Sequence, residues 1–507
     1  MRIPRVRSLL LLLFLAAGAG WAAEGRVDVI LWFDTEDYLS LPDDDATLRL
    51  ARMLSERGIR ATFKVVGEKA RVLEQRGRTD VIAALQKHAI GYHANLHSVH
   101  PTPTEYLANC GWLDGVAEFV RREGGGAADV RRIFAVPTLA CYGQPGSSWG
   151  AQAIGALPSI GVAPQGVPCY VDEGSHVGLN HQPFWYAGAL VVYNLGPNLT
   201  RMELHNPAAL EPAKEKVTAI AARLRANGGG LISIYYHPCE WIHRQFWDGV
   251  NFARGANPPR ERWRPPPLRT AEETDGAFER FGAYIDHIRA LPGVHWITAA
   301  DLPSIYPDST RTAGATETDW RELCRRLRDA TELDYQEMGG RVYSVADQFE
   351  LTIRAAAAAW NQPSLAFPAR LGGLLGPDEA VGPTRQVTAD GLATRDAVRD
   401  VANYLAVHRR VPARVFVGSN PVSPAAFVVG LASALAEAPD RPAWTADTKF
   451  NFGRNAGLAT ERHIAADTPG LFGGWVIHPE GFRAPKVMEV ARLQAWTLKP
   501  ALRIPPP

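Results

Sequence analysis

The chain has 507 residues, which is longer than one typical domain, so two or more domains are expected. Its 54 lysines and arginines balance 53 aspartates and glutamates to a formal net charge of +1, and this near-neutrality gives no sign of a nucleic acid partner. Apolar residues make up 46% of the chain and charged residues 21%, as in ordinary soluble globular proteins.

The first residues have the pattern of a secretory signal peptide. Arg2, Arg5 and Arg7 give a positive start, an apolar run follows at 9–17, and small residues continue to Ala23. The apolar run is shorter than the ~20 residues that a membrane span needs. We therefore expect residues 1–23 to be removed and the protein to be exported, to the periplasm, the extracellular space or the cell wall, without an integral span. An uncleaved membrane anchor is the alternative.

Strand-like and helix-like patterns then alternate from residue 24 to 308. Strands are predicted at 27–33, 61–66, 89–93, 231–236 and 294–298, and the first of them is expected to be buried. Helical spacing of apolar residues is found at 47–57 and 79–88. This alternation predicts an α/β domain with a parallel sheet or barrel.

The composition changes near residues 307–316, and a more helical region follows. We expect a linker at 309–340 and a smaller, mainly helical accessory domain at 341–507. Ser344 and Ser423 each precede a helical pattern in the N-cap position and follow a short β-like run. These two units form a weak internal repeat.

Three carboxylates follow the first predicted strand: Asp34, Glu36 and Asp37. Repulsion between like charges so close together would raise their pKa values unless a cation lies among them. The alternative interpretation is a solvated acidic loop, since three more aspartates follow at 43–45.

Histidines follow two other predicted strands. His93 and His97 are four residues apart, and on one helical turn both imidazoles could hold the same metal ion, with His100 nearby. In a parallel β/α barrel the carboxyl ends of the strands lie on one face, so the acidic cluster and His237 would join them. Two imidazoles and one carboxylate leave open positions on a zinc-like ion. An imidazole at position 237 could then act as a proton donor, or it could be a structural histidine.

In these motifs, residues 26–306 resemble the polysaccharide deacetylase family, also called the NodB-homology family or carbohydrate esterase family 4. The matching segments, in family order, are 61–67, 88–97, 231–237 and 296–302. The resemblance implies a distorted (β/α)₇ barrel that binds a divalent metal, usually Zn²⁺. It also implies an N-deacetylase, a metal-dependent hydrolase that removes acetyl groups from a cell-wall or extracellular polysaccharide.

Carried over by position, the resemblance makes Asp34 the general base and His237 the general acid, with His93 and His97 as metal ligands. The carboxylate ligand is less defined, because the family has two adjacent aspartates where this chain reads Asp-Thr-Glu-Asp. Asp37 is favoured, with Glu36 as the alternative.

One departure concerns the family's Arg-x-Pro-aromatic motif, whose arginine orients the base. The counterpart in this chain has Pro137, but Ala135 stands in the place of the arginine. Arg131 or Arg132 could substitute from elsewhere, and the segment 169–181 could rebuild this part of the site.

The later region has a resemblance of its own. Residues 402–427 resemble a pseudomurein-binding-type repeat, and 343–359 resemble it more weakly, which implies attachment to a cell-wall polymer. A helical domain that only packs on the barrel is the alternative. For the whole chain two other functions remain open: a hydrolase of another C–N or ester bond on the same barrel, and a non-catalytic cell-wall-binding protein.

Overall fold

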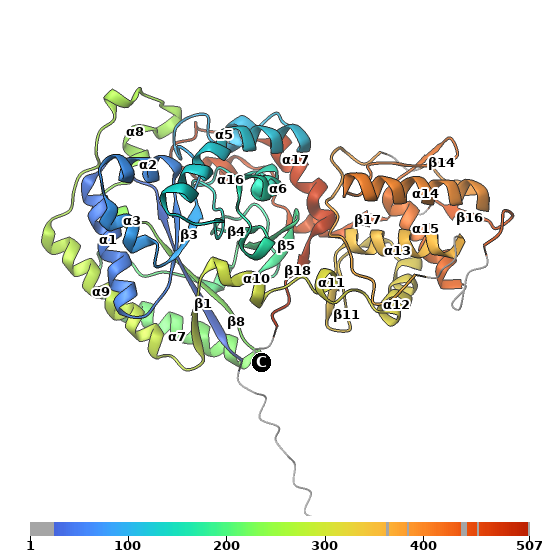
Figure 1. Ribbon diagram of the computed structural model, residues 1–507, viewed down its shortest axis with the longest axis horizontal. Coiled ribbons are helices and arrows are strands. Elements are labelled where there is room, and N and C mark those ends of the chain that lie inside the picture. Colours follow the sequence, from blue (N-terminus) through green and yellow to red (C-terminus); the bar gives the residue numbers. More distant parts are fainter. Residues whose placement is uncertain (1–24, 361–364, 383–384, 438–443, 454–455, 505–507) are drawn as a thin grey trace, which may run out of the picture.

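The computed structural model describes residues 25–360, 365–382, 385–437, 444–453 and 456–504, so the predicted signal peptide lies outside the described residues. An α/β unit and a helical module lie side by side (Figure 1). Within the described ranges, no helix is both long enough and apolar enough to cross a membrane.

The α/β unit is built on parallel strands. They are β1 (Val27–Thr35), β2 (Thr62–Val65), β3 (Ala89–Tyr92), β8 (Gly230–Tyr236) and β9 (Val294–Ile297). The hydrogen-bonded order is β3-β2-β1-β8-β7, where β7 is Leu199–Thr200, and β9 pairs with the first half of β1. The predicted parallel α/β sheet is therefore confirmed, and its closure into a barrel stays a prediction.

Strand β1 is buried on both of its faces. Val29 and Phe33 contribute to one apolar core, while Ile30 and Trp32 contribute to another on the opposite face of the sheet. A continuous apolar run is typical of a parallel strand covered on both sides, which is why this strand could be recognised from sequence.

Single bridges carry the sheet further, from Tyr92 in β3 to Tyr142 and then to Tyr170 in β4. The elements on that side are β4 (Cys169–Val171), β5 (Phe184–Tyr186), β6 (Ala189–Val192) and β18 (Lys499–Pro500), in the order β18-β5-β6-β4. Residues near the end of the chain thus add a strand to the same sheet.

Helices cover the strands. They are α1 (Leu41–Glu56), α2 (Gly67–Gln75), α3 (Thr79–Leu85), α5 (Trp112–Ile133), α7 (Leu210–Ala226) and α9 (Ala271–Ala290). Helix α1 begins six residues before the predicted start at 47, because Pro42 suits the first turn and acidic side chains there are favoured by the helix dipole. Asp43 and Asp44 therefore lie in a helix and are buried, which rules out the solvated acidic loop at these two positions.

The helical module has its own apolar core, which includes Phe349, Val398 and Phe427. Its main helices are α12 (Glu317–Arg328), α13 (Val345–Trp360), α14 (Gly391–His408) and α15 (Pro424–Glu437). Helix α12 contributes Leu323 and Leu327 to this core, so residues 309–340 are not a linker but part of the folded module.

The weak internal repeat is visible as two hairpin–helix units. Hairpin β11 (Gln336–Met338) and β12 (Arg341–Tyr343) leads into α13, and hairpin β14 (Val415–Val417) and β15 (Asn420–Val422) leads into α15. The Ser344 and Ser423 hydroxyls accept hydrogen bonds from the N–H groups of Asp347 and Ala426, at 3.1 and 3.2 Å. Both N-cap predictions are confirmed.

After residue 458 the chain returns to the α/β unit. The returning elements are the 3₁₀ helix Ala459–His463, α16 (Pro469–Gly473), α17 (Pro485–Leu493) and β18. Phe472, Val487, Met488 and Leu498 belong to the same apolar core as β1. Figure 1 shows α16 and α17, in red, within the α/β unit beside the blue-green α5 and α6 (Ala151–Ala156). The expected accessory domain at 341–507 therefore does not match the packing: the module is an insertion that ends near 458.

A buried ammonium group holds the junction of the two units. Lys499 Nζ lies 2.7 Å from Asp308 Oδ1, where the chain leaves the α/β unit, and 2.7 Å from Asp347 Oδ2 in the module. All three side chains are buried.

The packing of the return segment can be tested with Met488→Ala. The Met488 side chain is fully buried, so its truncation should lower the free energy of unfolding of the α/β unit by about 2–5 kcal/mol. Urea denaturation followed by tryptophan fluorescence would measure the change. Lys486→Ala, at an exposed position of the same helix, is the control and should stay near wild type. Equal stability of Met488→Ala and wild type would contradict a domain boundary near residue 458.

Candidate active site

The predicted site residues lie at one edge of the sheet. Asp34 is near the carboxyl end of β1, His93 follows β3, and His237 follows β8. Because β1, β2, β3 and β8 are parallel, these ends lie together. Their side chains are close together: Asp34 Oδ1 lies 3.3 Å from His93 Nδ1, and Asp34 Oδ2 lies 3.6 Å from His237 Nε2.

Glu36, His93 and His97 form a buried triad. Glu36 Oε2 lies 2.9 Å from His97 Nε2 and 3.5 Å from His93 Nε2. One ligand atom from each residue lies within 4.8 Å of the other two. Burial alone would raise the pKa of Glu36, but the charge of His97 and the contact with His93 bring it well below its ordinary value.

The two imidazoles are brought together by a turn and not by the helical turn that their spacing suggested. Ala94 and His97 have φ values of 66° and 56°, in the left-handed region, and the His93 and His97 ring centroids lie 4.9 Å apart. His93 Nδ1 contacts Gly143 O at 3.0 Å, and His97 Nδ1 contacts Ser98 Oγ at 2.6 Å. These contacts turn both Nε2 atoms toward Glu36.

The triad fits a divalent metal ion. Two imidazole nitrogens and one carboxylate oxygen are a donor set that suits Zn²⁺ with positions left for water and substrate. His97 Nε2 is buried and makes no hydrogen bond, although it lies 2.9 Å from Glu36. A cation bound between this nitrogen and the carboxylate oxygen would satisfy both atoms, with the imidazole in its neutral form. The contacts of both Nδ1 atoms also fix the ring orientations, as around known metal ligands.

Asp37, the carboxylate favoured from the sequence, is not part of this triad. Its Oδ1 accepts hydrogen bonds from the N–H groups of Leu39 and Ser40, at 2.8 and 3.2 Å, and its Oδ2 lies 3.3 Å from His243 Nδ1. Burial raises the pKa of Asp37 to about 6. The geometry thus favours Glu36 as the carboxylate ligand, because the Asp37 carboxylate instead holds the residues that precede α1.

The cation beside Asp34 is a lysine from the neighbouring strand. Lys64 in β2 lies directly opposite Asp34 in the register, and its Nζ lies 2.9 Å from Asp34 Oδ1 and 2.9 Å from Asp172 Oδ2. Neither arginine suggested as a substitute reaches the base. Arg132 pairs with Glu74 at an exposed position, and Arg131 packs against Gly161. Lys64, which also pairs with Asp172, is thus the cation that contacts Asp34.

The groups around Lys64 stabilise the positive charge of its ammonium group. Its side chain is fully buried, and its Nζ donates to Val171 O at 3.0 Å and lies 4.0 Å from the centre of the Trp32 ring. A Cβ on Gly143 would lie 2.0 Å from Nζ, so only glycine fits at that position. Burial would lower the pKa of Lys64, but Asp172 and Asp34 raise it above its ordinary value.

His237 is held by a carboxylate that sequence reasoning did not assign. Its Nδ1 lies 2.8 Å from Glu240 Oε1, which also accepts the backbone N–H of His237, and Arg201 pairs with the same carboxylate. Burial would lower the pKa of His237, but the hydrogen bond to Glu240 and the charges of Glu36, Glu240 and Asp34 raise it to about 10. Nε2 is left to face Asp34.

Of the segment 169–181, Asp172 and Glu173 reach the site. Burial raises the pKa of Glu173 to about 7, and the charges of Asp172, His237 and Asp34 also act on it. Asp172 contacts Lys64, whereas His176 lies away from the metal triad, where its ring stacks on Trp149 at 5.0 Å between centroids. His100 is also apart, since its Nδ1 contacts Glu105 at 2.8 Å. The signal that could have revealed Lys64 is a lone lysine inside an otherwise apolar strand, where a charged side chain needs a buried partner.

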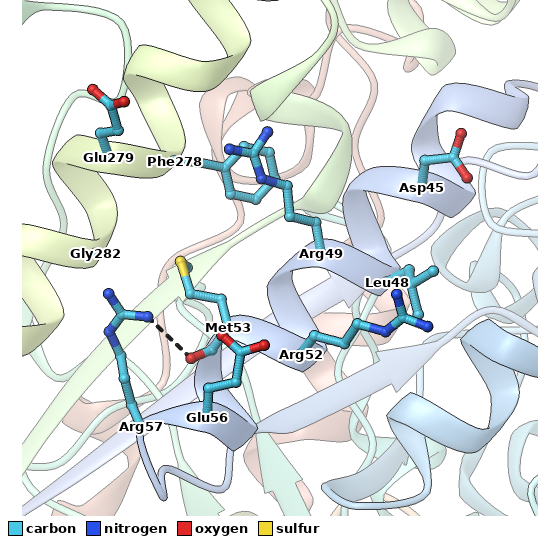
Figure 2. A pocket seen from close by; sticks show the side chains of 10 residues that line it. All are labelled: Asp45, Leu48, Arg49, Arg52, Met53, Glu56, Arg57, Phe278, Glu279 and Gly282. Atoms are coloured by element: carbon cyan, nitrogen blue, oxygen red, sulfur yellow. Dashed lines mark hydrogen bonds between the residues drawn. The ribbon is translucent and has the colours of Figure 1, made fainter.

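A separate surface pocket lies on the outside of the α/β unit. Its volume is about 440 Å³, and it opens between α1 and α9. Figure 2 shows the guanidinium of Arg49 over the ring of Phe278. Two of its lining arginines pair with carboxylates outside the lining, Arg49 with Asp275 and Arg57 with Asp286. None of the residues that line it belongs to the metal triad or contacts Asp34.

Known proteins give only distant likenesses. No family model and no curated protein matches the chain. A protein described as a polysaccharide deacetylase from Mycobacterium smegmatis is 14% identical (55% of this chain and 89% of that one, TM-score 0.35), and the allantoinase PuuE is 10% identical (57% and 93%, TM-score 0.35). A CE4 esterase from Streptococcus mutans is 14% identical (54% and 87%, TM-score 0.30). At such low TM-scores these likenesses carry no argument about function.

The role of Glu240 can be tested with Glu240→Gln. Loss of the carboxylate charge should lower the pKa of His237 from about 10, because the effect of burial, which disfavours the charged imidazole, is then less fully compensated. In wild type the raised pKa adds stability that is complete below the unfolded value near 6.5 and is lost as the pH rises toward 10. An NMR titration of the histidine ring protons would show the shift. Glu211→Gln, on an exposed residue, is the control, and an unchanged midpoint in Glu240→Gln would refute the assignment.

The charge balance around Lys64 can be tested with Lys64→Met. The variant leaves Asp34 and Asp172 without their shared cation, so the free energy of unfolding should fall by about 3–5 kcal/mol. The double variant Lys64→Met/Asp172→Asn removes one of the two repelling charges and should recover part of the loss. Chemical denaturation of both proteins measures this difference. A double variant less stable than Lys64→Met would show that repulsion is not the cause.

Proposed function

We propose that the chain is a metal-dependent hydrolase that removes acetyl groups from an N-acetylated polysaccharide. The observation that carries the proposal is a buried Glu36–His93–His97 triad beside Asp34. The imidazole of His237, whose pKa is raised to about 10, faces the Asp34 carboxylate. A metal triad, a base and an acid at one sheet edge are what hydrolysis of an amide requires.

The proposed metal ligands are Glu36, His93 and His97, and Zn²⁺ is the ion we propose. A divalent ion bound there would polarise the acetamide carbonyl and acidify a water molecule. Binding needs neutral imidazoles and an ionised carboxylate. Glu36 is already held in its ionised form, and burial lowers the pKa of His93. Burial also opposes the charged form of His97, but the Glu36 carboxylate raises the pKa of His97 above its ordinary value, so an ion that binds there would displace a proton from His97.

Asp34 is the proposed general base. Its carboxylate takes a proton from the attacking water while the water oxygen adds to the carbonyl carbon. Lys64 fixes Asp34 Oδ1 at 2.9 Å, which leaves Oδ2 directed toward His237 and the open side of the site. Lys64 therefore sets the direction in which the base presents its free oxygen.

His237 is the proposed general acid. With Nδ1 bound to Glu240, the imidazolium presents its Nε2–H to the nitrogen of the breaking C–N bond. Transfer of this proton releases the free amine, and acetate is the second product. The raised pKa keeps the acid protonated at neutral pH. General acid and base assistance of this kind is worth ~10²–10⁴-fold each.

The polysaccharide class, export and wall attachment also belong to this proposal. The catalytic geometry supports amide or ester hydrolysis, and the choice of an N-acetylated wall or extracellular glycan follows the sequence resemblance. The helical module is proposed to hold the enzyme on a cell-wall polymer. This would raise the local concentration of substrate.

Acetate release from defined acetylated glycans, with and without a chelator, tests the proposed reaction. Wild type should release acetate from N-acetylated oligosaccharides, lose this activity in chelator and regain it with Zn²⁺. Glu36→Gln should bind Zn²⁺ poorly and be inactive, since it removes the only charged ligand of the triad. Asp37→Asn is the matched control, because it lies next along the chain but outside the triad, and it should still bind the ion.

The outcomes separate the competing functions. Release from O-acetyl esters alone, or cleavage of another amide, would replace the N-deacetylase by the second hydrolase on the same site. Failure of wild type to bind Zn²⁺ or any other divalent ion, together with no hydrolysis, would leave a non-catalytic binding protein. Zn²⁺ binding that is lost in Asp37→Asn and kept in Glu36→Gln would restore the first choice of ligand.

A further inference from the structure

A turn in the return segment lies against the candidate site. This turn, residues 472–478, is hydrogen-bonded to loops from three other parts of the chain. The N–H groups of Arg254 and Gly255 donate to Val476 O and Ile477 O, at 3.0 and 2.7 Å. Ser147 Oγ donates to Phe472 O, and His478 Nε2 contacts Thr102 Oγ1 at 3.3 Å. The turn is thus a fixed part of the wall around the site, although it follows the whole helical module in sequence.

One side chain of this turn contacts a member of the metal triad. The Trp475 ring lies edge-on to the imidazole of His97, with centroids 5.4 Å apart and an interplanar angle of 84°. Trp247 contacts the same imidazole at 5.8 Å and 41°. His97 therefore lies in a pocket made by two indoles from segments that are far apart in the sequence.

Trp475 is itself held in one orientation. Its Nε1 donates to Asp248 Oδ2 at 2.8 Å, and the Asp248 side chain is buried. The ring lies directly over Gly146, where an added Cβ would be 2.3 Å from the indole. A hydrogen bond at one end and a glycine beneath the ring leave the indole little freedom to move.

His97 needs such support because its backbone is in the left-handed region, with φ of 56°. A residue other than glycine keeps this conformation only when its surroundings impose it. Packing from two sides also reduces the rotamer freedom that the imidazole would lose when an ion binds, which favours binding.

We propose that Trp475 is a positioning residue for the metal ligand His97, so that the ion site is complete only when the return segment is docked. This inference rests on the proposed function, since it takes the Glu36–His93–His97 triad as the metal site. It adds a residue from the end of the chain that no spacing or motif around the triad indicates.

The test compares three variants for Zn²⁺ affinity, measured by competition with a chromophoric chelator, and for the visible absorption spectrum of the Co²⁺-loaded protein. Trp475→Ala should weaken Zn²⁺ binding by about tenfold or more, in the range seen when residues behind metal ligands are removed. It should also change the Co²⁺ spectrum, because His97 is then free to adopt other orientations. Trp475→Phe keeps a ring but loses the hydrogen bond to Asp248, and should lie between Trp475→Ala and wild type.

Val476→Ala is the matched control, since the Val476 side chain is exposed in the same turn. It should bind Zn²⁺ like wild type. Wild-type affinity and an unchanged Co²⁺ spectrum in Trp475→Ala would overturn the inference while leaving the proposed function intact. Absence of Zn²⁺ binding in wild type would instead reject the metal site itself. If Trp475→Ala fails to fold by circular dichroism, Trp475→Phe decides, and an affinity equal to wild type would count against the proposal.

Discussion

The organisation of this site depends on the neutralisation of buried negative charge at one edge of a parallel sheet. The carboxylates buried there include Asp34, Glu36, Asp37, Asp43, Asp44 and Asp172. Lys64 lies between Asp34 and Asp172, and Lys69 Nζ contacts the carboxylates of Asp43 and Asp44, each at 2.6 Å. Asp37 is instead held by two backbone N–H groups and has a raised pKa.

Glu36 differs from all of these carboxylates. Its pKa is held low, and among the described residues its ion-pair contacts are with two imidazoles alone. The carboxylate whose pKa is held low without an ammonium or guanidinium partner is therefore the one that faces two nitrogen ligands. A divalent cation fits at this point, because it would balance the remaining charge. The parallel register places Lys64 opposite Asp34, so this carboxylate receives its cation from an adjacent strand.

The sequence was sufficient to predict features that a local pattern of residues determines. It was insufficient for features that depend on contacts between distant parts of the chain. Strands β1, β2, β3, β8 and β9 were predicted within two residues of their ends, whereas the two-residue strand β7 was not predicted. Strand β1 was recognisable because a strand covered on both faces is a continuous apolar run. The choice between Asp37 and Glu36 depends on side-chain direction after the strand, which spacing does not encode. The HxxxH motif suggested a helical turn, yet Ala94 and His97 adopt left-handed conformations. Lys64 and the return segment were missed because their partners are distant in sequence.

The insertion of the helical module bears on the role proposed for it. A flexible linker would let a wall-binding domain move freely relative to the α/β unit. The local substrate concentration that it provides would then depend on the length of the linker. In this chain residues 309–340 are folded, and the chain enters the module at a buried junction where Lys499 contacts both Asp308 and Asp347. It leaves the module near residue 458, where the Thr460 hydroxyl donates to Ala495 O at 2.9 Å. Two adjacent anchors restrict orientation far more than one tether does. A module that holds a polymer would then present it at a set angle to the sheet edge. The segment that follows the module packs on the core of the α/β unit and carries Trp475, which contacts His97. The module is therefore connected to the Glu36–His93–His97 triad through one packed segment of chain.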